Sequence, residues 1–200
     1  MSLMNAVSLL YNPAEEWKKI GAKNPGILNT YLGYLIFFAA IPPVSAFIGS
    51  TYVGWTIGDG ETHKLTVESA MKLSIIAYFA ILAAVLVLSA FVQWMAKTYG
   101  AKPSLSDCVN LTAYSCSPLF LVGLLGVFPI LWLNMLTSIV AIAMAVNLLY
   151  KGVPTLMNIN EEKGFLFASS ILTVCMVVLV GMLAITIIFW GSGFSPIFIS

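Results

Sequence analysis

PSLSDCVNLTAYSCSP, residues 103–118, opens a long apolar segment and is the most polar part of it. Ser104 followed by Asp107 is typical of a helix start, where an N-cap side chain and an acidic side chain three residues later bind free backbone N–H groups. A helix turns by about 100° per residue. One face of this helix, which we call the polar stripe, therefore carries Asp107, Asn110, Tyr114 and Pro118.

The polar stripe is predicted to face protein or a wet cavity, because an unpaired polar group in hydrocarbon is unfavourable. We therefore expect other segments to pack around it. Asp107 is interpreted as a helix cap, and Asn110 and Tyr114 as groups that hydrogen bond to neighbouring helices. Pro118 is expected to bend the helix before its glycine-rich outer end. The alternative interpretation is a ligand or partner site that opens toward the cytoplasm and centres on Asn110 and Tyr114.

The composition excludes an ordinary soluble domain. Of the 200 residues, 60% are hydrophobic and 8% are charged, whereas typical soluble domains carry about 25% charged residues. We expect an all-α membrane protein in which residues 1–200 form one domain, a single bundle of five transmembrane helices. The predicted spans are residues 28–49, 70–96, 107–127, 130–150 and 166–190. The formal net charge of +1 argues against nucleic-acid binding.

Residues 1–26 are predicted to be a cytoplasmic lead-in at the membrane interface. Asn12 is a plausible cap and Pro13 suits the first helical position, so a short amphipathic helix is expected over residues 12–20. Its apolar side chains either lie on the lipid interface or belong to a solvated segment with one interfacial tryptophan. These side chains are Leu9, Leu10, Trp17 and Ile20.

A small β-hairpin is predicted in the loop of residues 50–69, because β-forming residues at 51–57 and 62–66 flank Gly58-Asp59-Gly60. A strand would point Asp59, Glu61 and His63 to one side, which makes them a candidate metal set. Three ligands from one strand give poor geometry for zinc, so a solvated hairpin is the preferred interpretation. No metal and no other cofactor is expected.

The placement of the lysines predicts the orientation. Seven lie before the first span, between the second and third, and between the fourth and fifth: Lys18, Lys19, Lys23, Lys97, Lys102, Lys151 and Lys163. Only Lys64 and Lys72 lie on the opposite side. Because lysine accumulates in cytoplasmic loops, the N-terminus is predicted to be cytoplasmic and the C-terminus to lie outside.

Three further segments are informative when taken together: NPAEEWKKI at residues 12–20, YGAKPSL at residues 99–105 and AYSCSPL at residues 113–119. In their order and spacing they resemble the Yip family, the Ypt/Rab-interacting proteins with five spans that occur in eukaryotes and bacteria. More narrowly, the YohC-type inner-membrane branch is similar at AFIG (46–49), GW (54–55), GDG (58–60) and NIN (158–160). The resemblance implies a five-helix fold, a bacterial cytoplasmic (inner) membrane and a role in membrane organisation. The Asp-Leu-Tyr-Gly-Pro element of the eukaryotic branch is missing here, so small-GTPase binding is not implied.

The sequence predicts a protein that is not an enzyme. It has no phosphate-binding Gly-Lys loop, no Cys-x-x-Cys motif and no His-Glu-x-x-His motif. The first hypothesis is a scaffold or adaptor that organises other membrane proteins, copies of itself, or lipid. The alternative is a small oligomeric transporter or channel, in which the polar stripe faces Asn134 or Asn147 and the break at Pro42-Pro43 acts as a gate.

Overall fold

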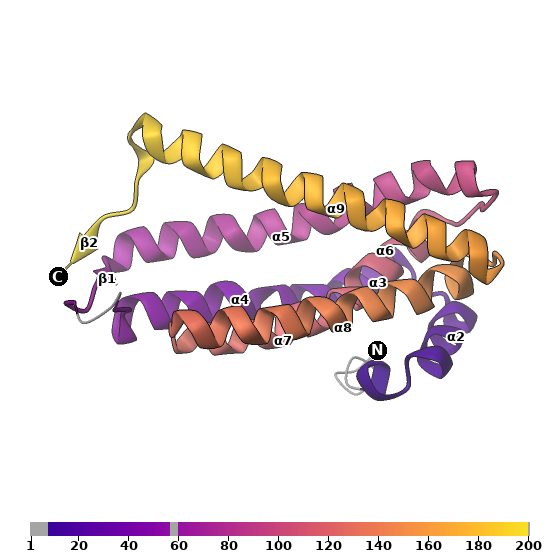
Figure 1. The fold of residues 1–200 in the computed structure, drawn as a ribbon, viewed down its shortest axis with the longest axis horizontal. Helices are drawn as coiled ribbons and strands as arrows, with labels where there is room; N and C mark the ends of the chain where they lie inside the picture. The colour runs from indigo at the N-terminus through magenta and orange to yellow at the C-terminus, as the bar shows by residue number, and fades with distance from the viewer. Residues whose placement is uncertain (1–7, 57–59, 200) are drawn as a thin grey trace.

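The computed structural model describes residues 8–56 and 60–199, which are mainly helical (Figure 1). The first span combines α3 (Ile27–Thr30) and α4 (Ile36–Ile48), and the second is α5 (Val67–Ala96). The third combines α6 (Leu105–Ser115) and α7 (Ser117–Val122), and α8 (Leu131–Met157) and α9 (Glu161–Phe189) follow. Within the described residues, five helices are long and apolar enough to cross a membrane, which confirms the predicted bundle. The assignment of residues 1–200 to one domain stays a prediction.

The third span lies at the centre of the bundle. In its most apolar stretch 61% of the residues are buried, against 17% for the span that begins with α5 and 6% for the span that begins with α9. α3, α5 and α8 pack against α6, and α4 and α8 pack against α7. Asn110, Tyr114 and Pro118 of the polar stripe are therefore enclosed by protein, as predicted, and Asp107 at its start is half-buried.

The first and third spans approach closely because glycines lie between them. A Cβ atom added at Gly49, just after α4, would lie 2.0 Å from the carbonyl oxygen of Gly126. A Cβ atom at Gly123 would lie 2.7 Å from Cγ of Pro42. Pro42 and Pro43 lie inside α4 without ending it, since neighbouring helices support the backbone where a proline removes a hydrogen bond.

The short helix predicted near the N-terminus is present as α2 (Pro13–Lys23), with Pro13 in its first turn. The exposed fraction of Leu9, Trp17 and Ile20 is 0%. Their side chains therefore lie neither on lipid nor in water, which differs from both interpretations of the sequence. These three side chains of the predicted lead-in instead belong to the core of the bundle, and Leu10 is partly buried against it.

A notch in α8 accommodates the Trp17 ring. The indole Nε1 donates a hydrogen bond of 3.0 Å to the carbonyl oxygen of Leu148. A Cβ atom at Gly152 would lie 2.7 Å from Cε2 of Trp17 and equally close to Cδ1 of Leu111. Only a residue without a side chain therefore lets α2, α6 and α8 meet at this point.

Two short strands close the end of the bundle that lies opposite α2 (Figure 1). β1 (Lys64–Leu65) pairs in antiparallel fashion with β2 (Phe198–Ile199), near the C-terminus. The predicted hairpin is represented by a single bridge between Trp55 and His63. The strand predicted from residue 51 is wrong for residues 51–53, because a π-helical turn over Gly49–Val53 extends the first span.

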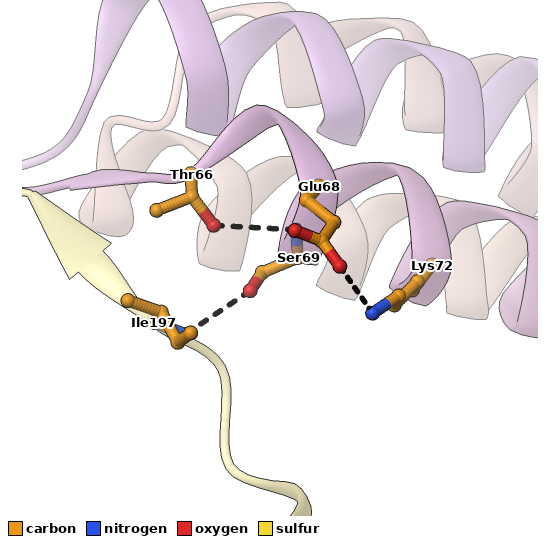
Figure 2. A network of polar contacts seen from close by, with 5 residues as sticks. All are labelled: Thr66, Glu68, Ser69, Lys72 and Ile197. Carbon is orange, nitrogen blue, oxygen red and sulfur yellow. Dashed lines mark hydrogen bonds and ion pairs between the residues drawn. The ribbon is translucent and has the colours of Figure 1, made fainter.

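Figure 2 shows how the C-terminal segment is held at the start of α5. Thr66 caps the helix, since its Oγ1 accepts a hydrogen bond of 3.2 Å from the backbone N–H of Ser69. The Ser69 hydroxyl in turn accepts a hydrogen bond of 3.2 Å from the backbone N–H of Ile197. An ion pair of 2.6 Å joins Glu68 and Lys72. Both of its side chains are exposed, so the pair contributes little to stability.

The lysines are separated between the two ends of the bundle. The seven predicted to be cytoplasmic lie on α2, in the loop after α5, and near the facing ends of α8 and α9. Those segments gather at one end in Figure 1, whereas Lys64 and Lys72 lie near the strands. The separation fits the expected pattern of charges. The orientation itself, with a cytoplasmic N-terminus, stays a prediction.

Candidate functional site

Asp107 forms a capping box at the start of α6, as its spacing from Ser104 predicts. Its Oδ2 accepts hydrogen bonds from the backbone N–H of Ser104 at 2.9 Å and from the Ser104 hydroxyl at 2.6 Å. The Ser104 Oγ accepts a hydrogen bond of 3.2 Å from the backbone N–H of Asp107. These bonds satisfy backbone donors that have no partner within the helix. The carboxylate is therefore used locally.

Asn110 joins α6 to the start of the first span and to the residue Pro25 just before it. Its side chain is 1% exposed. The Oδ1 atom accepts a hydrogen bond of 2.5 Å from the Thr30 hydroxyl, and Nδ2 donates one of 3.0 Å to the carbonyl oxygen of Pro25. The Ser106 hydroxyl donates a second bond of 2.6 Å to the same carbonyl. Both ends of the buried amide are thus engaged, which fits the predicted role between helices.

Tyr114 belongs to an aromatic cluster between the first and third spans. Its ring centroid lies 4.6 Å from that of Tyr34, which lies 4.3 Å from that of Phe38. The Ser117 hydroxyl donates a hydrogen bond of 2.6 Å to the carbonyl oxygen of Tyr114. Because that bond uses its only proton, the 2.6 Å contact between Ser117 Oγ and the Tyr34 hydroxyl has Tyr34 as the donor.

Pro118 lies in the first turn of α7, directly after the end of α6. The helix is interrupted at Cys116, whose carbonyl oxygen accepts hydrogen bonds from the N–H groups of Leu119 and Phe120. The interruption lies next to the residue at which a bend was predicted, since a proline nitrogen cannot donate within a helix. Pro118 is buried, so this end of the stripe has a packing role.

The structure does not bring Asn134 or Asn147 to the polar stripe. Asn134 lies near the start of α8, where its Nδ2 donates a hydrogen bond of 2.8 Å to the carbonyl oxygen of Phe128. α8 meets α6 at Gly152, which is about 27 Å farther along the helix at 1.5 Å per residue. Asn147 is exposed on α8. The two asparagines predicted to face the stripe are therefore separate from Asn110.

The candidate metal residues form no cluster within the part of the chain that the structure describes. Glu61 and His63 are exposed, and Asp59 lies outside the described residues. No group of three potential ligands among His, Cys, Asp and Glu occurs in residues 8–56 and 60–199.

Four residues of this network were missed from the sequence. Thr30, Tyr34 and Phe38 follow one another at intervals of four, so they share one face of the first span. That spacing could have identified them. Ser117 lies one turn beyond Tyr114 on the third span and offered the same signal. The carbonyl oxygen of Pro25 has no such signal, because it depends on the path of the backbone.

Comparison with known proteins places this architecture in a family. The sequence model of the Yip1 domain matches residues 7–182. The chain belongs to the Yip1 domain family. The resemblance seen in the lead-in, the loop after α5 and the third span is thereby confirmed.

A relative of this Yip1-family protein is the inner membrane protein YohC of Escherichia coli (strain K12), at 39% identity over 186 residues. The alignment covers 93% of this chain and 95% of YohC. The protein of the same name in Escherichia coli O6:H1 (strain CFT073) has the same identity and coverage. No solved structure matches the chain. Together with the five membrane-spanning helices, the relatives confirm the predicted location in a bacterial inner membrane.

Proposed function

We propose that this Yip1-family protein is a non-enzymatic scaffold or adaptor that binds other membrane proteins or further copies of itself through α9. The proposal rests on the exposure of that helix. The ten consecutive residues 179–188 are all exposed. Ten residues cover nearly three helical turns, so this part of α9 is exposed on every side of the helix.

The remainder of α9 is held firmly. Its part near α2 packs against α8 and α5, and Tyr150 and Ser169 join α8 to α9 by a hydrogen bond of 2.8 Å. Figure 1 shows α9 diverging from the other helices toward the end that carries the strands. Gly181 lies in the free half, and no atom would lie within 4 Å of a Cβ atom there. A small residue on an open face allows another membrane helix to approach closely.

The transport alternative has less support. A transporter of the predicted kind needs polar groups that are free to bind a solute. The Asn110 amide is engaged by Thr30 and Pro25. Pro42, which was predicted to act as a gate, packs closely against Gly123 of the third span. The break in the first span therefore does not lie at an open gap between helices.

Crosslinking from α9 tests the scaffold proposal. A photoreactive amino acid is placed at Ile185 or Ile187, whose exposed fractions are 66% and 71%, and at Ile139 of α8 as a control with 62%. After irradiation of native membranes, mass spectrometry should identify a reproducible protein adduct from both α9 positions. The control position should give lipid adducts. Ile139 is about as exposed to the bilayer as the two α9 positions, but it does not lie on the proposed binding helix. Lipid adducts alone from α9 would contradict the proposal.

Replacing Asn110 with leucine separates a packing role from a transport site. Asn110→Leu leaves the Thr30 hydroxyl and the Pro25 carbonyl with fewer partners, so we expect the free energy of unfolding to fall by about 1–3 kcal/mol. Asn147→Leu is the matched control, since Asn147 is exposed, and should change stability by less than about 0.5 kcal/mol. Thermal unfolding in detergent measures both. A stable Asn110→Leu protein that has lost solute flux in liposomes would support the transporter instead.

A further inference from the structure

A pocket of about 470 Å³ lies where α5 ends, apart from both α9 and the polar stripe. This volume falls within the range of small-molecule sites, about 300–1,000 Å³. We call it the lysine pocket because two of its residues carry positive charge. Its lining consists of Ala90, Gln93, Trp94, Lys97, Ala101, Lys102 and Pro103.

The loop after α5 folds back so that both lysines line the same pocket. Gly100 adopts the left-handed conformation with φ 76°, which favours glycine. The N–H of Ala101 donates a hydrogen bond of 3.0 Å to the carbonyl oxygen of Ala96, which closes the end of the helix. The Gln93 side chain then donates one of 3.3 Å to the carbonyl oxygen of Pro103. The loop that carries Lys102 is therefore attached to α5 at two points.

In the part of the chain that the structure describes, no carboxylate forms an ion pair with Lys97 or Lys102. Within residues 8–56 and 60–199, ion pairs involve Lys19 and Lys72, and neither of these lines the pocket. Asp107, which follows the loop, is engaged by the capping box. Lys97 and Lys102 are exposed, so their ammonium groups are available to an external anion.

An apolar groove of about 440 Å³ continues from the lysine pocket along α5. It is lined by Val87, Ala90, Phe91 and Trp94, and it shares Ala90 and Trp94 with the lysine pocket. Trp94 is 69% exposed, and tryptophan favours the boundary between hydrocarbon and water. From Lys97 to Val87 the helix rises about 15 Å, which is half the thickness of a hydrocarbon core of about 30 Å.

We propose that the lysine pocket and this groove form a binding site for an anionic phospholipid. The phosphate lies between Lys97 and Lys102, and one acyl chain lies along Phe91 and Val87. The charge of the pocket selects an anionic over a zwitterionic headgroup, as basic pockets at the ends of membrane helices do. The groove selects a lipid over a soluble phosphate, because its apolar surface is covered only if the ligand carries a chain. This site is separate from the scaffold face on α9.

Competition between two lipids tests the headgroup. Purified protein in detergent receives equal amounts of phosphatidylglycerol and phosphatidylcholine, and native mass spectrometry measures the bound fraction of each. The wild-type protein should retain phosphatidylglycerol preferentially. Lys97→Gln with Lys102→Gln should weaken that binding by a factor on the order of 25, at about fivefold for each lysine near a membrane surface. Phosphatidylcholine binding should stay unchanged.

A matched variant removes the same charge elsewhere. Lys18→Gln with Lys23→Gln alters two exposed lysines of α2 outside the pocket, and it should retain the lipid preference. Equal binding of the two lipids by the wild-type protein, or an equal loss in both lysine pairs, would overturn the proposal. All four lysines are exposed, and unchanged melting temperatures verify that the variants fold.

A third variant tests the acyl chain. Ala90 lines both cavities and is exposed to the bilayer, so Ala90→Trp fills the groove without altering the lysines. Phosphatidylglycerol binding should fall at least tenfold. If it does not fall, or if glycerol 3-phosphate displaces the lipid completely, the site binds a headgroup alone and the phospholipid assignment is overturned.

Discussion

Replacing Trp17 with alanine is expected to lower the free energy of unfolding by about 3–5 kcal/mol, the range for removing a large buried aromatic side chain. Trp17 of α2 is 0% exposed, and its ring packs against Gly152 of α8. The variant leaves a cavity and removes the hydrogen bond to the carbonyl oxygen of Leu148. Thermal unfolding in detergent measures the change, and protease sensitivity of α2 shows whether the helix has left the bundle.

Two tryptophan controls distinguish this packing from a general effect of removing an aromatic ring. Trp132→Ala alters a residue with an exposed fraction of 68%, so we expect little change in stability. Trp17→Phe keeps most of the ring volume but cannot donate to Leu148, and it should lose about 1 kcal/mol for the hydrogen bond in addition to the difference in volume. Equal melting temperatures for Trp17→Ala and Trp132→Ala would show that α2 is not part of the core.

Adding a single methyl group at Gly49 is expected to destabilise the protein by about 3 kcal/mol or more, at the upper end of overpacking effects. The Cβ atom of Gly49→Ala would lie 2.0 Å from the backbone oxygen of Gly126. A backbone atom cannot move aside as a flexible side chain can, so the first and third spans must separate at this point. Thermal unfolding and the yield of folded protein measure the effect.

Gly33→Ala is the matched control in the same span. No atom lies within 4 Å of a Cβ atom added there, so no contact has to change. The variant should be neutral or slightly more stable, because alanine favours a helix over glycine by about 1 kcal/mol. A Gly49→Ala protein that unfolds like Gly33→Ala would contradict the close approach of the two spans.

The candidate site was predictable from the sequence to the extent that its bonds are local. The capping box of Ser104 and Asp107 joins residues three positions apart, and its spacing alone predicts it. The enclosure of Asn110 followed from the cost of an unpaired amide in hydrocarbon. Its partners did not, because Thr30 and Pro25 lie 80 and 85 positions away in the sequence.

The expected partners Asn134 and Asn147 show the same limit. Both are polar residues in the fourth span, and the sequence alone does not distinguish which of them, if either, lies near Asn110. Their depth and direction on α8 depend on how that helix packs, and the contact of Gly152 with Trp17 and Leu111 is part of this packing. A glycine carries no hydrophobic or polar signal, so its role as a notch becomes visible only when the opposing helices are in place.

The sequence by itself determined the number of membrane spans, the start of α6, the enclosure of the polar stripe and the family. Each depends on properties of short segments, namely apolar length, cap spacing and local motifs. Only the tertiary structure decided that Trp17 is buried, that Asn110 bonds to Thr30 and Pro25, and that α9 diverges from the bundle. Those features depend on contacts between segments far apart in the chain, which the free energy of packing selects and no single segment encodes.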